Sequence, residues 1–364
     1  MALIQSFYSK PIPNSTKNSS GITCILNDRR LFFYTCPQDI RLNHDYFSTL
    51  LSCLSSNHII HLFESMLLSK RILLFSSLPS KLTKCCLALS FLLYPFIWPY
   101  SFVSIMPSSW LHDLLDSPCP FVYGCLSETL EQIPSIIDSD DIIRVDLDSN
   151  TLIDETERTN ILPVNLRQTL EGSFEYLKRF RLVAKLNSTL INIAVSEACL
   201  HVFVDLFSHL PEYFKRQQNP LSFSLCSNYF TRYDSGIDLQ SVTSIDCQPT
   251  DEENRLGYEF RSKEFLDIQP NPSYVLFLKE FMHGMIFLKF LDDYQRNDST
   301  KTEMFSLFYQ RLNERRQMTH DDLTINPLVR FRQTIDLLET QIKQTSKQTN
   351  SSFSKFVKTI LNRN

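Results

Sequence analysis

The fold is decided by the stretch from Leu67 to Gly124, which reads LLSKRILLFSSLPSKLTKCCLALSFLLYPFIWPYSFVSIMPSSWLHDLLDSPCPFVYG. It holds three short apolar runs, Ile72–Phe75, Phe102–Met106 and Phe121–Gly124, each next to a proline, a basic pair or a polar turn. An apolar segment of helical length separates the first run from the second. Short buried strands that alternate with helices are typical of a parallel sheet with crossover connections. The stretch therefore predicts an α/β fold with a mostly parallel sheet flanked by helices.

Further elements are predicted on both sides of this core. They are a hairpin of Ile22–Leu26 and Leu31–Tyr34, amphipathic helices over Tyr46–Ser55 and Ile59–Leu68, a strand over Ile142–Leu147, and helices over Ile191–Leu210, Tyr274–Tyr294 and Lys301–Arg315. We expect Asn57 to cap the second of these helices. We also expect Glu197 and Asp205 to lie on the polar side of theirs. From Pro163 onward the period is helical, so a Rossmann-like sheet is expected to be followed by an all-helical extension.

Shifts in composition divide the chain into regions. Residues 1–20 are interpreted as the remnant of an upstream module and a linker rich in proline and serine. Residues 21–160 form the central α/β lobe, residues 161–315 the helical segment and residues 316–364 a polar tail. Within the helical segment, residues 217–257 are rich in Ser, Asn, Gln and Asp and lack a sustained period. They predict a disordered insertion, because they cannot bury enough apolar area to offset the ordering of the chain.

The composition excludes several classes of function. With 364 residues, 43% of them hydrophobic, and a formal net charge of −4, the chain can bury a large core and has no charge excess that would favour nucleic acid. Its six glycines stand alone, so a P-loop and a dinucleotide-binding loop are both absent and no cofactor is expected. None of the ten cysteines is spaced as CxxC, and free thiols suit a reducing compartment. We expect a cytoplasmic protein without a metal site.

The segment most similar to a membrane span is Leu87–Ile105. Pro95 and Pro99 split it into two short halves, and a helix that ends near Tyr94 before a strand explains both prolines. No transmembrane segment is therefore expected. The basic amphipathic end of the tail leaves peripheral association with a membrane surface open.

Catalytic constellations are weak in this sequence. His58, His61 and Glu64 are spaced by three residues, but on a helix the third side chain turns away from the first, so ordinary histidines are favoured over a metal site. His112 and Asp113 are neighbours and diverge on a helix, so they form no proton relay. There is no GxSxG motif to anchor a hydrolase triad. We expect no catalytic residue and no covalent chemistry.

Two acidic residues follow the last predicted strand of the α/β lobe. Asp146 and Asp148 alternate at its end and precede Ser149 and Asn150. A divalent ion is one interpretation. Capping of the turn is the favoured one, because Asp, Ser and Asn side chains bond to nearby backbone groups in turns.

Aromatic residues alternate at two-residue spacing between the predicted helix and the second strand. They are Tyr94, Phe96, Trp98, Tyr100 and Phe102. Some must face the core, whereas an exposed aromatic patch would mark a partner surface. Core packing and partner contact are both open for each of them, and for Trp110.

Three motifs occur in a fixed order along the central stretch. They are Tyr94-Pro95-Phe96-x-Trp98, then Met106-Pro107, then Leu114-Leu115-Asp116-x-Pro118-x-Pro120-Phe121-x-x-Gly124. In this order they resemble the central segment of the DENN domain. The stretches SKLTKCCLAL and VSEACLHVFVDLF are most similar to its subfamily two. The resemblance covers about residues 21–315, apart from 217–257, and most of the N-terminal longin-like module of the family is not found.

This resemblance implies a guanine-nucleotide exchange factor for a Rab-type small GTPase in vesicle traffic, recruited to endosomal or Golgi membranes. Such proteins hold the GTPase against a longin-like lobe and an α/β lobe, and they release nucleotide by displacing the switch regions. The contact candidates are Tyr100, Trp110, His112 and Asp113, because α/β sheets present loops at their strand ends. Pro99 and Tyr100 stand where the family usually has Gln-His, which is a departure from its pattern.

Two other interpretations are open. A non-catalytic Rab-binding scaffold would bind the GTPase without releasing its nucleotide. An α/β enzyme with an unrecognised substrate would need a deep pocket with paired titratable groups.

Overall fold

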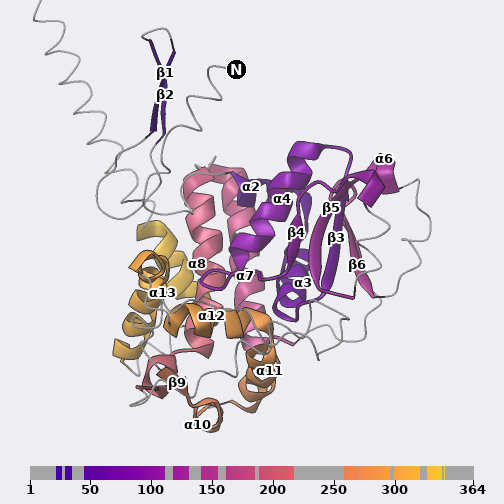
Figure 1. Ribbon diagram of the computed structural model, residues 1–364. Coiled ribbons are helices and arrows are strands. Elements are labelled where there is room, and N and C mark those ends of the chain that lie inside the picture. The colour runs from indigo at the N-terminus through magenta and orange to yellow at the C-terminus, as the bar shows by residue number, and fades with distance from the viewer. Residues whose placement is uncertain are drawn as a thin grey trace, which may run out of the picture.

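A five-stranded sheet forms the centre of the computed structural model, which describes residues 22–26, 29–34, 45–110, 118–130, 141–154, 161–184, 188–216, 258–269, 271–295, 299–319, 326–337 and 340. The strands are β3 (Arg71–Ser76), β4 (Ser101–Val103), β5 (Phe121–Leu126), β6 (Ile142–Asp146) and β7 (Thr151–Ile153), and their order is β4–β5–β3–β6–β7. β4, β5, β3 and β6 run parallel, and β7 pairs antiparallel with β6. The predicted mostly parallel sheet is confirmed (Figure 1).

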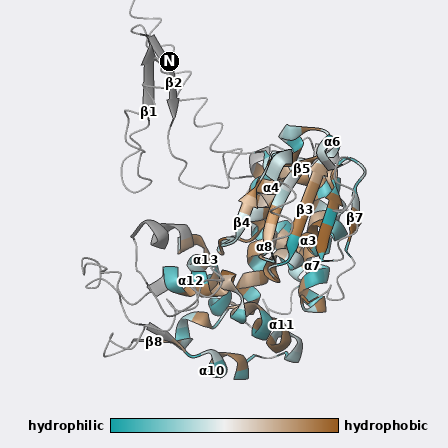
Figure 2. Cartoon of the chain, turned by 45° about the vertical axis from the view of Figure 1, so that its right-hand side comes forward, coloured by the Kyte–Doolittle hydropathy of each residue, from teal (hydrophilic) through white to brown (hydrophobic). Residues whose placement is uncertain are grey.

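The sheet buries both of its faces. One face lies in the main core together with three helices, α2 (Tyr46–Cys53), α3 (Ser56–Leu67) and α4 (Pro79–Leu92). Ile72 and Leu74 of β3 point to that face, whereas Leu73 between them joins a smaller cluster on the other. Side chains alternate in this way along every strand. Burial on both faces explains why these strands read as continuous apolar runs in the sequence, and β3 and β5 are accordingly hydrophobic in Figure 2.

Helices make up most of the second half of the chain. They are α7 (Val164–Ala184), α8 (Ser188–Leu206), α10 (Ser262–Asp267), α11 (Pro272–His283), α12 (Met285–Gln295) and α13 (Ser299–Gln317). α7 and α8 pack against the α2–α4 layer, so the helical part forms a further layer beside the sheet (Figure 1). The predicted helical extension is confirmed, although it also contains one short antiparallel strand pair.

Phe96 joins the two parts of the molecule. It follows α4 and is 3% exposed, and its ring centroid lies 4.8 Å from Phe203 on α8, 5.1 Å from Phe281 on α11 and 5.0 Å from Phe290 on α12. Edge-to-face and tilted contacts at these separations contribute beyond the burial of area alone. This member of the aromatic series therefore belongs to the core.

Other predicted elements are confirmed with small changes in their limits. β1 (Ile22–Leu26) and β2 (Arg29–Tyr34) pair antiparallel as the expected hairpin. α4 ends at Leu92 and β4 follows it, as the two prolines in this segment indicated. No helix within the described residues is long and apolar enough to cross a membrane.

Three local predictions are wrong. The N-cap of α3 is Ser55, whose hydroxyl accepts from the His58 backbone N–H at 3.1 Å, and not Asn57. The helix expected over Tyr274–Tyr294 is two helices, because the backbone is extended at Gly284 between α11 and α12. Glu197 is not on a polar face, since its residue is 1% exposed within α8.

Several predictions concern residues outside the described ranges. The insertion at 217–257 and the N-terminal region 1–20 fall there, so the proposed division into regions stays a prediction. The strands on either side of the insertion, β8 (Phe214–Arg216) and β9 (Tyr258–Phe260), pair antiparallel and bring its two ends together. In the segment predicted to be a polar tail, residues 327–337 form a helix.

Candidate functional site at the carboxyl edge of the sheet

The parallel strands all end at one edge of the sheet, which we call the carboxyl edge. It consists of three segments that follow β3, β4 and β6, namely Ser76–Leu82, Ser104–Trp110 and Leu147–Asn150. Parallel α/β sheets present their ligand-binding loops at this edge. The carboxyl edge is therefore the first place to look for a function.

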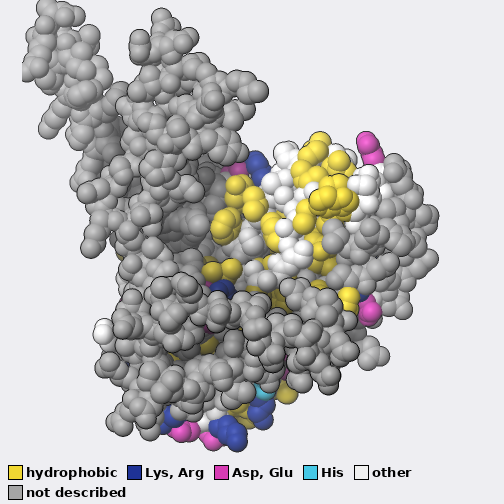
Figure 3. Space-filling view, in the orientation of Figure 1, with side chains coloured by type: hydrophobic (Ala, Val, Ile, Leu, Met, Phe, Trp, Pro, Cys, Tyr) yellow, Lys and Arg dark blue, Asp and Glu magenta, His cyan; other side chains and the backbone are white. Residues whose placement is uncertain are grey.

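One half of the carboxyl edge is apolar. Leu78, Ile105 and Trp110 are 53%, 41% and 62% exposed, which is unusual for side chains of this size. Hydrophobic side chains are visible on the face of the molecule that carries α4, β4 and β5 (Figure 3). Exposed apolar side chains are typical of a surface that binds another protein where they form a contiguous patch, so this half of the carboxyl edge is a candidate for one.

Gly124 on β5 determines the path of the segment after β4. The Met106 backbone N–H donates to the Gly124 carbonyl oxygen at 2.7 Å. A Cβ atom on Gly124 would lie 2.2 Å from the Ser104 carbonyl oxygen and 2.9 Å from Leu82 Cγ. The missing side chain thus lets the chain cross β5 closely and brings Ile105 beside the first turns of α4.

The other half of the carboxyl edge is polar and centred on Asp148. Its carboxylate accepts from the Ser76 hydroxyl at 2.9 Å, the Ser77 backbone N–H at 2.7 Å and the Lys81 ammonium at 2.5 Å. The Lys81 hydrogen bond, with help from Ser77, holds the pKa of Asp148 well below its ordinary value. Asp148 therefore stays ionised at neutral pH and fixes the first turn of α4.

The turn after β6 is capped by Asp146, one of the two predicted aspartates, whereas Asp148 bonds to Ser76, Ser77 and Lys81 instead. Asp146 accepts from the Asp148 and Ser149 backbone N–H groups at 2.8 and 3.3 Å. Asn150 has a positive φ of 57° and its side-chain oxygen accepts from the Ser55 backbone N–H at 2.8 Å. The same oxygen lies 3.0 Å from His58 Nδ1. These contacts hold the turn against the junction of α2 and α3.

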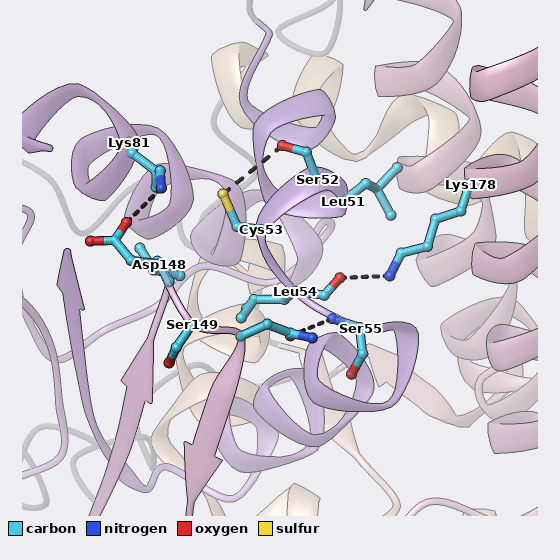
Figure 4. Close-up of a pocket in the computed structure, with 11 residues that line it drawn as sticks. Leu51, Ser52, Cys53, Leu54, Ser55, Lys81, Asp148, Ser149 and Lys178 are labelled. Carbon is cyan, nitrogen blue, oxygen red and sulfur yellow. Dashed lines mark hydrogen bonds and ion pairs between the residues drawn. The ribbon is translucent and has the colours of Figure 1, made fainter. Parts of the chain in front are cut away.

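A pocket of about 460 Å³ opens between this turn, α4 and the end of α2. Its lining residues are Leu51, Ser52, Cys53, Leu54, Ser55, Lys81, Leu147, Asp148, Ser149, Asn150 and Lys178. Lys178 donates to the Leu54 carbonyl oxygen at 2.6 Å, and Lys81 and Asp148 point toward one another (Figure 4). Asp148 is the one carboxylate among the lining residues, and its lowered pKa makes it a weak general base.

Buried acids elsewhere in the described residues have structural roles. Burial raises the pKa of Glu64, as it would in a catalytic acid, but Arg167 and the Leu162 backbone N–H contact the carboxylate. These contacts join α3 to the start of α7. His61 similarly lies 2.7 Å from Asp154, so His58, His61 and Glu64 have separate partners. Across the described ranges, no group of three or more His, Cys, Asp or Glu side chains could hold a metal ion.

The structure separates the predicted contact residues. Trp110 lies at the carboxyl edge, whereas Tyr100 precedes β4 at the opposite end of that strand. Tyr100 is partly buried and its ring centroid lies 5.1 Å from that of Trp98. His112 and Asp113 fall outside the described residues.

Sequence reasoning missed Leu78, Ile105 and Lys81 as members of this surface. A usable signal was present for Leu78, which follows a predicted strand by only a few residues, whereas Ile105 was placed inside the predicted strand Phe102–Met106 and β4 ends earlier, at Val103. What could not be seen was their exposure, because an apolar residue beside a buried strand is most often buried itself.

Comparison with known proteins identifies the relatives of this chain. Residues 1–150 match the family model of the DENN (AEX-3) domain. The chain is 31% identical over 185 residues to DENN domain-containing protein 2A of Mus musculus, covering 48% of this chain and 18% of that protein. It is 34% identical over 178 residues to DENN domain-containing protein 2C of Homo sapiens, covering 48% and 19%.

A shorter relative gives a similar result. DENN domain-containing protein 2D of Homo sapiens is 29% identical over 189 residues, which are 51% of this chain and 38% of that protein. The aligned part is thus less than half the length of each of these three relatives. Over about half of its own length, this chain is a homologue of the DENN domain-containing proteins of subfamily two, and it carries the DENN domain match in residues 1–150.

Proposed function

We propose that this chain binds a Rab-type small GTPase and promotes the release of its GDP in membrane traffic. The observation that carries the proposal is the homology to DENN domain-containing proteins. The resemblance to this family implies an exchange factor, which regulates a GTPase and performs no covalent chemistry. We further propose that it acts in the cytoplasm and is recruited to endosomal or Golgi membranes.

Exchange needs only differential binding. If the chain binds the nucleotide-free GTPase more tightly than the GDP-bound form, linkage requires that it weakens GDP binding by the same factor. A hundredfold weakening corresponds to about 2.7 kcal/mol of differential binding energy. A few well-placed side chains can supply such an energy.

The carboxyl edge is the surface that we propose for the GTPase. Trp110 is 62% exposed there, and Leu78 and Ile105 provide further apolar area. Tryptophan is enriched among residues that dominate binding energy at protein interfaces. Lys81 and Asp148 beside this apolar group could orient a partner through their charges.

A non-catalytic Rab-binding scaffold is the second candidate. The matched region is 18% and 19% of the first two relatives, so activities of the whole relatives need not reside in it. A scaffold would use the same surface but would bind GDP-loaded and nucleotide-free GTPase with equal affinity.

The release of fluorescent GDP from a panel of Rab proteins tests both candidates. We expect the full chain, alone or with a longin-like module added as a separate polypeptide, to accelerate release from at least one Rab. The Trp110→Ala variant should lose about tenfold of this acceleration, because truncating a binding hot spot costs more than about 1 kcal/mol. Leu276→Ala is the matched control, since Leu276 is 69% exposed on α11 and lies outside the carboxyl edge.

The possible outcomes separate the candidates. Rab binding without any acceleration would reject exchange and support the scaffold. No binding to any member of the panel would reject both. Equal losses in the Trp110 and Leu276 variants would reject the carboxyl edge as the binding surface.

A further inference from the structure

Leu78 occupies a position at which leucine is unfavourable. It is the N-cap residue of α4, its side chain forms no capping hydrogen bond, and it is 53% exposed. Ser, Thr, Asn and Asp are strongly preferred at an N-cap, and apolar residues are disfavoured there. Natural chains break local preferences of this kind chiefly at functional sites. Leu78 is therefore a candidate contact for the partner rather than a residue chosen for the helix.

A neighbouring strand fixes the segment after β3 that carries Leu78. β6 pairs parallel with β3, so the residues that follow the two strands lie side by side, and the Leu147 backbone N–H donates to the Phe75 carbonyl oxygen at 3.0 Å. Leu147 is buried, which anchors this contact. The next residue, Asp148, donates its own backbone N–H to Asp146 at 2.8 Å. The Asp148 carboxylate thus starts from a backbone that is itself held in place.

The Asp148 carboxylate bonds to the segment on both sides of Leu78. On one side it accepts from the Ser76 hydroxyl at 2.9 Å and from the Ser77 backbone N–H at 2.7 Å. On the other side it accepts from the Lys81 ammonium at 2.5 Å. The Ser76 oxygen in turn accepts from the Leu78 backbone N–H at 3.1 Å. One carboxylate therefore joins three points of the segment, and the backbone of Leu78 belongs to the same network.

We propose that Asp148 is a positioning residue, which holds Leu78 in place for contact with an apolar group of the GTPase. This inference rests on the proposed function and adds a role to one residue of that surface. Contact with an apolar group removes the exposed area of Leu78 from water. A segment that is ordered before binding loses less conformational freedom on binding than a mobile one does, so the hydrogen bonds of Asp148 raise the affinity.

Trp110 is held independently of this network. Its backbone N–H donates to the Pro107 carbonyl oxygen at 3.1 Å. None of the hydrogen bonds that Asp148 makes with described residues reaches the segment Ser104–Trp110. A change at Asp148 should therefore alter the contribution of Leu78 to binding and leave that of Trp110 as it is.

Double-mutant cycles of GTPase affinity test the inference. The Kd for the Rab protein that binds most tightly is measured for the full chain and for its single and double variants. Leu78→Ala should weaken binding about tenfold in the wild-type chain but less than about twofold in Asp148→Asn, in which the leucine is no longer held. Trp110→Ala should weaken binding by the same factor with and without Asp148→Asn. This control cancels the effect of the unpaired Lys81 charge, which both cycles share.

Two further backgrounds separate position from charge. Ser76→Ala leaves the charge unchanged and removes the hydroxyl between Asp148 and the Leu78 backbone N–H, so it should reduce the effect of Leu78→Ala as Asp148→Asn does. Lys81→Arg should retain the full effect, because a guanidinium also pairs with a carboxylate. Equal losses from Leu78→Ala in every background would overturn the inference and leave the proposed function standing.

Hydrogen–deuterium exchange of the free chain distinguishes a failed inference from a failed function. Asp148→Asn should speed exchange in Ser76–Leu82 about fivefold, because hydrogen bonds that hold this segment are lost. Asp45→Asn is the matched control, since it removes the 2.5 Å ion pair with Lys84 on the same helix and should leave Ser76–Leu82 unchanged. If no Rab protein binds, the proposed function fails and the GTPase contact of Leu78 fails with it. Exchange that is unchanged in Asp148→Asn would overturn the positioning role whether or not a Rab protein binds.

Discussion

Gly124 shows how one missing side chain shapes the candidate surface. The Ser104 carbonyl oxygen and the Leu82 side chain occupy the space in which a Cβ atom would lie. One of these neighbours is backbone and cannot turn aside. The glycine of the family motif is thus explained by close packing between two strands and a helix, and not by an unusual backbone angle, since its φ is not positive.

Gly124→Ala is predicted to destabilise the chain by about 3 kcal/mol, because overpacking against backbone forces strands β4 and β5 apart. The free energy of unfolding in urea measures this loss. Gly284→Ala serves as the control, since the nearest atom to its Cβ would be 3.2 Å away and its φ of −76° suits alanine. Equal losses in the two variants would contradict the packing argument.

Asp148 provides a prediction that depends on pH. Its pKa is lowered in the folded chain, chiefly by Lys81, so its contribution to stability is present above the ordinary pKa of 3.8 and is lost as the pH falls below that value. Asp148→Asn should therefore cost about 1 kcal/mol at pH 7, a figure reduced by the exposure of the pair. Urea unfolding is measured for the wild type and the variant from pH 7 to pH 2.5. The difference between their free energies of unfolding should shrink only below about pH 4. A difference that stays constant across this range would reject the assigned role.

At the scale of elements, three arginines attach α13 to the rest of the helical extension. Arg311 bonds both oxygens of Glu197 on α8 at 3.1 and 3.2 Å, and Arg315 contacts Asp205 at 2.7 Å. Arg316 pairs with Glu212 beyond the end of α8. The Glu197 side chain is only 1% exposed, whereas that of Glu212 is 46% exposed. The three ion pairs should therefore contribute very different amounts to the free energy of unfolding.

Arg311→Met is predicted to cost about 3 kcal/mol of unfolding free energy, because it takes the guanidinium away from a buried carboxylate. Arg316→Met should cost less than about 1 kcal/mol, since its partner is exposed to solvent. Both changes keep an apolar stem of similar length, so the comparison isolates the charge. Thermal or urea unfolding that ranks the two variants in the opposite order would contradict this account of α13.

The inner strands of the central sheet, β3, β5 and β6, were predictable because they are buried on both faces, whereas the edge strand β7 was not predicted. Ile72–Phe75 is apolar at every position and Phe121–Gly124 at every position but the final glycine, and this pattern leaves little choice of structure. The break at Gly284 was missed because the apolar period continues through it, although glycine is frequent at helix ends. Ser55 competes with Asn57 for the cap of α3, and only the path of the chain decides between two such similar residues.

Tertiary contacts determine two features that the sequence did not predict, the helix over residues 327–337 and the burial of Glu197. In the helix over residues 327–337, Phe331 and Ile335 are buried and Leu328 fits against Gly172 of α7. The helical spacing of these three apolar residues is present in the sequence, but the distant helix that covers them is not. Glu197 was misplaced for the same reason, because its partner Arg311 comes from a distant helix.

For the whole molecule, the sequence indicated the family of the chain, whereas its partner and its contact residues stay predictions. Motif order produced the resemblance to the DENN domain, which the comparisons confirm. Trp110 lies at the carboxyl edge, as expected of a residue after a parallel strand, but Tyr100 lies at the other end of β4. Tyr100 precedes β4 and Trp110 follows it, so the two residues lie at opposite ends of the same strand.

Hydrogen–deuterium exchange in the full chain, alone and with a nucleotide-free Rab, tests the central claim most directly. The account predicts slower exchange in Ser76–Leu82 and Ser104–Trp110 on binding, with little change in α10 and α11, which do not belong to the carboxyl edge. A stable complex in which protection avoids both segments of the carboxyl edge and appears in the helical extension would contradict it.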